Sequence, residues 1–363
     1  MSSFEPRIAL PEHNSDICEI FRSTPMEGQI SIRFEREPDY FVGSRIQNLE
    51  QRVYIGWDKK ARKAVAVTNV GSRPVYVDGE MRNVPYYCDL RILPEYRSRT
   101  LMARGFRFLR DHLLQGDDYA QCLIVSDNLK ALDVLTSGRA GLPGFYHTGD
   151  YNTWAISTRQ KFKSSSSGVQ IRRAGADDRS AMQKFMDLEA PRKLFYPVYD
   201  FNEIGSHPYY ENQRLEDYFL AFQDSRLVGI LGCWDVEFCK QSRVVSYSTS
   251  LRWMRKIFNR LAFINNGFQL PPEGSLLKYF ILHTLLIQND DPEILRALIN
   301  QVGLESSGYD YFLLGLAARD PLNDAVRKLK KRLYRAGHYL ISFGKPDVLQ
   351  KTESNFYLEA ARL

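Results

Sequence analysis

Residues 84–114 constrain the fold of this chain more than any other segment, because two different hydrophobic periods meet there. Apolar residues alternate with polar ones up to Ile92, which is the period of a half-buried β-strand. Pro94 ends this alternation. From Leu101 onward, apolar residues recur every three or four positions, which is the period of an amphipathic helix. The segment therefore predicts a strand that leads through the short basic turn PEYRSR into a helix.

The basic turn brings positive charge to the start of the predicted helix, where Arg97 and Arg99 lie. The first N–H groups of a helix have no partner within it and form the positive end of its dipole, so they favour an anion. The turn therefore predicts an anion site, although a basic surface turn without a ligand would account for the same residues.

The run DLRILPEYRSRTLMARGF resembles the acyl-CoA-binding motif of the GNAT superfamily of N-acetyltransferases. In that family a strand ends in P-E-Y-R, and a Q/R-x-x-G-x-G/A turn starts a helix under the CoA pyrophosphate. Arg97 falls on the Q/R position. The family's glycines would fall on Thr100 and Met102, and often on Ser98. Because glycine lets the backbone approach the phosphates, these larger residues imply either a shifted phosphate path or a turn that no longer binds CoA.

The resemblance also implies which groups would bind an acyl-CoA. In the family the central strand hydrogen-bonds the pantetheine as a neighbouring strand would, in a gap between two splayed strands. Here this implies the main chain of Leu90 and Ile92, while the N–H groups of residues 97–102 would face the pyrophosphate. A second family segment, N-x-x-A-x-x-x-Y, is matched at Asn128 and Ala131. The implied cofactor-binding residues are Leu90, Ile92, Arg97, Ser98, Arg99, Thr100, Leu101, Met102 and Asn128.

Acyl transfer to an amine needs a base for the ammonium proton and can use an acid for the departing thiolate. Asp89 is the candidate base, because it lies one step before Leu90 and some aminoglycoside-modifying relatives have an Asp in the same place. An ion pair with Arg91 or Arg97, or exposure to solvent, would explain this Asp without catalysis.

The candidate acid differs from the one in the family. The tyrosine that protonates the thiolate in many members falls here on Leu135, which has no proton to give. Tyr146 is therefore the candidate acid, with Tyr151 as a second choice. Tyrosine is abundant in this chain, at 21 residues, and packing explains either one equally well.

The stretch RQKFKSSSSG at residues 159–168 predicts a flexible linker, because serines and glycine bury nothing. Residues 1–158 then form an acyl-CoA-binding domain, and residues 169–363 repeat the same order of elements. The second helix start, at residues 289–293, carries three carboxylates that would repel a pyrophosphate. We predict an α+β chain of two tandem GNAT-like domains, each a mixed, largely antiparallel sheet flanked by helices, the second without a working CoA site. An unrelated α+β domain is the alternative for the second half.

Composition excludes several classes of protein. The five cysteines include no C-x-x-C pair and the six histidines show no metal spacing, so neither a disulfide framework nor a metal site is predicted. No apolar run is long enough to span a membrane, and the N-terminus resembles no secretory signal, so we expect a cytoplasmic protein. The net charge of +6 comes without a nucleic-acid-binding motif, and no nucleic acid is expected as a partner.

Two basic stretches, residues 252–260 and 327–335, have apolar residues at helical spacing. Solvated faces of packed helices are the simplest interpretation, and binding of the first stretch to an anionic membrane or nucleic acid is the alternative. The aromatic-rich residues 195–210 could line an acceptor pocket near residues 25–41 or could simply pack in a core.

The sequence thus predicts an acyl-CoA-dependent N-acyltransferase, most simply an N-acetyltransferase, that moves an acyl group from a CoA thioester to an amine by direct attack. Its substrates would be acetyl-CoA or another acyl-CoA and a small-molecule or peptide amine. The lost glycines and Leu135 favour an alternative, a non-catalytic acyl-CoA-binding or partner-binding module.

Overall fold

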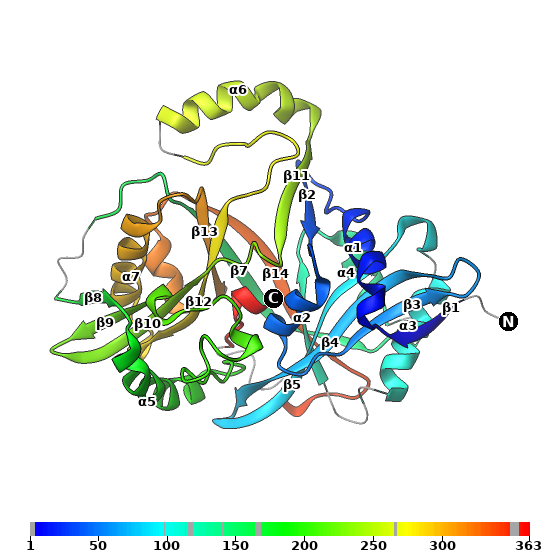
Figure 1. Cartoon of the computed structure of the whole chain (residues 1–363), viewed down its shortest axis with the longest axis horizontal. Helices are drawn as coiled ribbons and strands as arrows, with labels where there is room; N and C mark the ends of the chain where they lie inside the picture. The colour runs from blue at the N-terminus through cyan, green and yellow to red at the C-terminus, as the bar shows by residue number, and fades with distance from the viewer. Residues whose placement is uncertain are drawn as a thin grey trace.

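The computed structural model describes residues 4–97, 99–112, 114, 119–138, 141–163, 168–264, 267–348 and 356–363. Within these residues, helices cover a large, mostly antiparallel sheet, as the predicted α+β class requires (Figure 1). In the first half the elements are β1 Phe4–Ile8, α1 Asn14–Arg22, β2 Ile30–Glu35, α2 Tyr40–Gln47, β3 Val53–Asp58, β4 Lys63–Val77, β5 Glu80–Ile92, α3 Arg99–His112, β6 Tyr119–Val125, α4 Leu129–Leu135 and β7 Gly144–Ser157.

The second half supplies the remaining elements of the same sheet and its helices. Twelve strands of the described residues form the sheet, in the order β1-β3-β4-β5-β6-β14-β7-β13-β12-β10-β9-β8, while β2 and β11 pair apart from it. The elements are β8 Gln170–Arg173, α5 Arg179–Glu189, β9 Tyr218–Gln223, β10 Arg226–Trp234, β11 Gln241–Tyr247, α6 Thr249–Ile264, β12 Tyr279–Ile287, α7 Pro292–Glu305, β13 Tyr311–Ala317 and β14 Lys331–Ser342.

The antiparallel meander predicted around the central strand is present as β3, β4 and β5. Its second turn is tight, because Asp78 and Gly79 both have positive φ, at 58° and 80°. This is the backbone of the two-residue hairpin turn that Asp-Gly favours. The strand-to-helix step predicted from the sequence is also present, with β5 ending at Ile92 and α3 beginning at Arg99.

The two halves are interlocked through their last strands. β14 of the second half lies between β6 and β7 of the first, with Tyr339 opposite Cys122 on one side and His147 on the other. β7 in turn pairs with β13 of the second half. The two halves therefore share one sheet, and the domain limits at residues 158 and 169 stay a prediction.

One segment near the C-terminus differs from the prediction. The basic stretch at residues 327–335 has helical spacing, but it follows the short 3-10 helix Pro321–Val326 and enters β14. β14 pairs on both edges, and this pairing outweighs the helical spacing of its apolar residues.

The aromatic residues between positions 195 and 210 belong to the core. All of those considered for an acceptor pocket are at most 3% exposed, so packing in a core, the second of the two interpretations, explains them. They are Phe195, Tyr196, Tyr199, Phe201, Tyr209 and Tyr210.

Candidate functional site

The candidate site begins at the parallel strands β5 and β6. Their ladder contains a single residue pair, Tyr86 with Gln121. Beyond this pair β5 continues through residues 87–92, while β6 pairs with β14 on its other side. A strand edge without a partner presents free N–H and C=O groups. Leu90 and Ile92, whose main chain the sequence assigned to a pantetheine, lie along this open edge.

A single 3-10 turn, Pro94–Tyr96, joins β5 to α3. Arg97 follows it and is exposed. Its Nε donates a hydrogen bond of 3.2 Å to the carbonyl oxygen of Ile92. The guanidinium is therefore held at the end of β5, next in the chain to the start of α3, where the sequence predicted an anion.

The first turn of α3 is described in part. Ser98 lies outside the described residues, and only the backbone of Arg99 and Thr100 is described. The Leu101 and Met102 side chains pack into the hydrophobic clusters of the sheet, with Leu101 only 7% exposed. Met102, at one of the family's glycine positions, is therefore directed toward the core.

Asp89 lies at a β-bulge of β5 and has a positive φ of 56°. Its two carboxylate oxygens accept hydrogen bonds from Arg36 Nη2 at 3.3 Å and from the Tyr40 hydroxyl at 3.1 Å. The side chains of Asp89 and Arg36 are each 9% exposed. The carboxylate is thus held in a buried ion pair, but the partner is Arg36 and not Arg91 or Arg97, which the sequence suggested.

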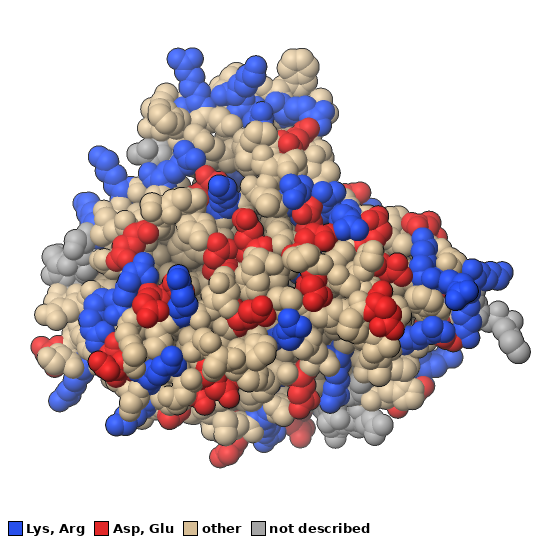
Figure 2. Space-filling view, in the orientation of Figure 1, with Lys and Arg blue, Asp and Glu red and all other residues tan. Residues whose placement is uncertain are grey.

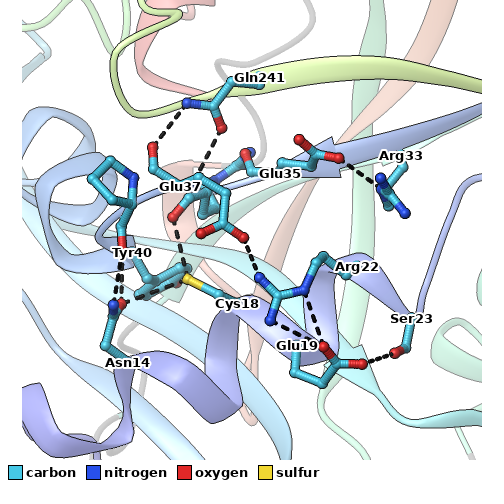
Figure 3. Close-up of polar contacts among 12 residues, drawn as sticks. Asn14, Cys18, Glu19, Arg22, Ser23, Arg33, Glu35, Glu37, Tyr40 and Gln241 are labelled. Atoms are coloured by element: carbon cyan, nitrogen blue, oxygen red, sulfur yellow. Dashed lines mark hydrogen bonds and ion pairs between the residues drawn. The ribbon is translucent and has the colours of Figure 1, made fainter. Parts of the chain in front are cut away.

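The loop that carries Arg36 is fixed by contacts from both halves of the chain (Figure 3). Cys18 Sγ donates a hydrogen bond of 3.3 Å to the carbonyl oxygen of Arg36. The side-chain amide of Gln241, in the second half, both accepts from and donates to the backbone of Glu37, at 3.0 and 2.8 Å. The groups around Asp89 are therefore held in place across the junction of the halves.

The second half has a comparable pair of parallel strands, β12 and β13, but its edge is filled. Thr284 on β12 has a positive φ of 49°, as Asp89 has on β5. Its N–H donates to Glu359 Oε2 at 2.7 Å, and the N–H of Leu285 donates to the Tyr357 hydroxyl at 3.2 Å. Residues 357–359 therefore accept the hydrogen bonds of the β12 N–H groups, which a bound ligand would otherwise use.

The start of α7, the second counterpart of α3, is occupied by carboxylates. Asp291 accepts a hydrogen bond of 2.8 Å from the N–H of Glu293 and caps the helix. Asp290 forms an ion pair with Lys193. These carboxylates complement the helix dipole themselves, so an anionic ligand would meet repulsion there.

The comparisons with solved structures cover nearly the whole chain. The chain matches a GCN5-related N-acetyltransferase from Sphaerobacter thermophilus at a TM-score of 0.54 and 13% identity, over 94% of this chain and 96% of the other. It matches a Saccharomyces cerevisiae N-myristoyltransferase with bound myristoyl-CoA at a TM-score of 0.60 and 10% identity, over 99% of this chain and 90% of the other. The fold is that of the GNAT superfamily.

A third structure with this fold is a GCN5-related N-acetyltransferase from Anabaena variabilis, with a TM-score of 0.50 and 10% identity over 93% of this chain and 72% of the other. By sequence, no protein-family model and no curated protein matches the chain. The similarity to the GNAT fold is therefore a similarity of structure. The gap between β5 and β6 lies beside Leu90, where the sequence resemblance predicted it.

Lys240, which the sequence analysis missed, lies in the same region as Asp89. Burial, and then the positive charge of Arg36, lower the pKa of its ammonium from 10.5 to about 8. Its Nζ donates a hydrogen bond of 2.9 Å to the backbone oxygen of Leu363. Gly43 of α2 packs against both Arg36 and Lys240. No local motif surrounds this lysine, because only the folded junction of the halves brings it here.

An apolar cavity of about 70 Å³ lies beneath α3, between the helix and strands β3, β4 and β5. Its walls include Leu90 and Ile92 from β5 and Leu101 and Met102 from α3. Gly105 also lines it, and a Cβ at that position would stand in open space. Because apolar cavities stay dry, such a space suits a hydrocarbon group.

Two further predicted site residues have structural partners of their own. The Asn128 side chain accepts a hydrogen bond of 3.2 Å from the N–H of Ala131 and so caps α4. The Tyr146 hydroxyl donates a hydrogen bond of 2.7 Å to the carbonyl oxygen of Gly344. Tyr146 lies on β7, which β14 and β6 separate from β5. Its role as an acid and that of Asn128 toward CoA stay predictions.

The described residues contain no cluster of three or more His, Cys, Asp or Glu side chains that could hold a metal ion. Among the same residues, no helix combines the length and the apolar character needed to cross a bilayer.

Proposed function

We propose that this protein is an acyl-CoA-dependent N-acyltransferase. The observation that carries the proposal is the open edge of β5 at residues 87–92. An extended pantetheine fits such an edge because it can hydrogen-bond the backbone as a neighbouring strand does. In the second half the segment ending in Glu359 fills the equivalent edge of β12, so we place the single acyl-CoA site in the first half.

The pyrophosphate would lie against the turn that follows β5. Arg97 supplies a cation there, and the N-terminal end of α3 supplies the positive end of a helix dipole. The side chains of Leu101 and Met102 face the sheet, so these two side chains do not lie over the helix start.

The reaction we propose is direct attack of the acceptor nitrogen on the thioester carbon. The C–N bond forms, the C–S bond breaks, and the CoA thiolate leaves. The amine must lose a proton, and Lys240 is our candidate to take it, because its pKa of about 8 leaves part of it neutral near neutral pH. Asp89 remains the candidate base predicted from the sequence, although its carboxylate is already paired with Arg36.

We further propose that the acyl group is longer than acetyl. Leu90 and Ile92, beside which the pantetheine would run, also line the apolar cavity under α3. An acetyl group would leave that cavity empty, whereas the first few carbons of a longer chain would fill its volume of about 70 Å³ and remove apolar surface from water. The acceptor, a small-molecule or peptide amine, would approach from the side of Arg36 and Tyr40.

The test begins with a titration of the purified protein with acetyl-CoA, octanoyl-CoA and myristoyl-CoA by calorimetry. A thiol-release assay over a library of amines and peptides with free N-termini follows. We expect tighter binding for the longer chains and release of CoA with at least one amine.

The outcomes separate the two candidate functions. Binding without release of CoA on any amine would support the non-catalytic acyl-CoA-binding module, which the missing glycines and Leu135 favour. Absence of binding for all three thioesters would contradict both functions.

A further inference from the structure

Helix α6 exposes large apolar side chains to solvent. It stands apart from the sheet at one end of the molecule (Figure 1). A helix on a soluble protein normally buries such side chains, so this exposure calls for a partner. The exposed fractions are 82% for Trp253, 57% for Met254, 64% for Ile257, 54% for Leu261, 70% for Phe263 and 67% for Ile264.

Five of these six residues share one face of the helix, and Phe263 lies outside it. With about 100° of turn per residue, Trp253, Met254, Ile257, Leu261 and Ile264 fall within an arc of about 100°. This arc is as wide as the apolar stripe of an amphipathic helix. We call these five residues the apolar face of α6.

The rest of the protein holds α6 by the opposite face. Asn259 exchanges two hydrogen bonds with the backbone of Leu270, at 2.9 and 2.7 Å, and Arg255 Nη1 donates to the carbonyl oxygen of Pro271 at 3.0 Å. Ala262 is the buried residue on that side. The polar contacts therefore fix the helix so that its apolar face is directed away from the protein.

Basic side chains flank the apolar face, and α6 contains no acidic residue. Figure 2 shows Lys and Arg side chains gathered over this end of the molecule. Arg252 pairs with Glu273 at 3.0 Å. Lys256 and Arg260 are exposed and enter no ion pair with the described residues. Around the helix axis both lie within about 60° of Trp253, at the edge of the apolar face, so they can meet negative charge where that face is buried.

We propose that α6 docks this protein on the surface of an anionic phospholipid membrane. Large aliphatic residues and a tryptophan on one face, with cations beside them, are the features of helices that lie in the interface of a bilayer. The cations would meet lipid headgroups while the apolar face enters the acyl region. Of the two interpretations of residues 252–260, membrane binding is therefore favoured over a packed helix with a solvated basic face. The reason is that α6 exposes large apolar side chains instead of burying them. The docking does not depend on the acyl-CoA site.

The experiment is sedimentation of the full chain with vesicles of phosphatidylcholine, with and without phosphatidylserine. Trp253 supplies an internal probe, because the other tryptophans, Trp57, Trp154 and Trp234, are partly or fully buried. We expect the protein to sediment with the anionic vesicles, with a shift of tryptophan emission to shorter wavelength. Binding should weaken as salt rises. The Trp253→Phe variant should bind but lose the shift.

Two pairs of variants distinguish docking through α6 from nonspecific binding to vesicles. Ile257→Glu should weaken vesicle binding by about tenfold or more, whereas Leu188→Glu on α5, at the same exposure of 64%, should not change it. Reversal of Lys256 and Arg260 to Glu should remove the preference for phosphatidylserine. Reversal of Lys184 and Arg226, which are exposed elsewhere, is the control.

The proposal is overturned if wild-type protein fails to bind anionic vesicles at low salt, or if Ile257→Glu binds as well as wild type. It is also overturned if the wild-type protein does not bind vesicles but is a dimer by sedimentation velocity, while the Ile257→Glu variant is a monomer. In that case a second copy of this chain covers the apolar face.

Discussion

At the scale of single residues, the site depends on contacts that no local pattern contains. The sequence singled out Asp89 from its place on the central strand, and the structure places it there. Its partner Arg36 could not be predicted, because a bulge in β5 and the loop after β2 must both form before the two side chains meet. Lys240 was missed for the same reason, since burial at the junction of the halves gives it its unusual pKa.

The first prediction concerns Lys240 as the base. Activity of the wild type should rise with pH through about 8, as the ammonium loses its proton. Lys240→Met should lower kcat by about a hundredfold and remove this rise, because a positioned base contributes rate enhancements of that order. The measurement is kcat for the best acceptor as a function of pH, from roughly 6 to 10. This range includes the pKa of about 8 on both sides, as a test of a general base requires. An unchanged profile in Lys240→Met would remove this residue from the mechanism.

Stability gives an independent measure of the same group. The folded-state pKa of about 8 lies below the ordinary value of 10.5, so the unfolded chain binds more protons between these values. The contribution of Lys240 to the free energy of unfolding therefore rises with pH across that window, by up to about 3 kcal/mol. Relative to wild type, Lys240→Met should be most stable below pH 8 in denaturant titrations. The exposed Lys184→Met should show no such dependence.

The second prediction concerns Arg97 as the cation at the phosphates. Arg97→Glu should raise the Kd for CoA by about tenfold, because it replaces attraction with repulsion beside the start of α3. Arg107→Glu lies on the same helix, is also exposed, and should change the Kd less than about twofold at moderate salt. Equal effects of the two variants would show that only the general charge of α3 matters.

At the scale of elements, the sequence predicted those whose period and flanking residues agree. The strand, basic turn and helix from β5 to α3 follow the prediction closely, because hydrophobic period, Pro94 and the turn all indicate the same boundaries. The first part of β14 was predicted wrongly, because RKLKKRLYR has helical spacing and only its two sheet partners make it a strand. Long-range pairing of this kind leaves no mark in a short window of sequence.

The third prediction tests α3 and the cavity beneath it. Gly105→Ala should raise the free energy of unfolding by about 0.5–1 kcal/mol, because alanine favours the helix and its Cβ meets open space. Gly105→Leu should also fold, but its side chain would narrow the cavity. We expect it to lose activity with myristoyl-CoA while keeping activity with short acyl-CoA, and Gly105→Ala to keep both. Equal activity of Gly105→Leu with all chain lengths would place the acyl group elsewhere.

At the scale of the whole molecule, the interlocked sheet ties the halves into one structure. The sequence indicated two similar halves from the order of their elements. It could not indicate that β14 enters the first half, because sheet order depends on which strand edges are left free when the halves come together.

The fourth prediction follows from this exchange of strands. A fragment of residues 1–158 contains β6 and β7 but lacks the β14 that joins them, so both would expose unpaired edges. We expect this fragment not to unfold cooperatively on heating, by circular dichroism. When it is expressed together with residues 169–363, the two should assemble into a complex that melts in one transition. Cooperative folding of the fragment alone would contradict the interlocked sheet.

The most direct test of the central claim is a crystal structure of the protein with a thioether analogue of myristoyl-CoA, which cannot transfer its chain. The account predicts the pantetheine alongside residues 87–92 of β5, the pyrophosphate at Arg97 and the first carbons of the chain in the cavity beneath α3. A ligand bound at β12 or elsewhere on the surface, with the edge of β5 left empty, would contradict it.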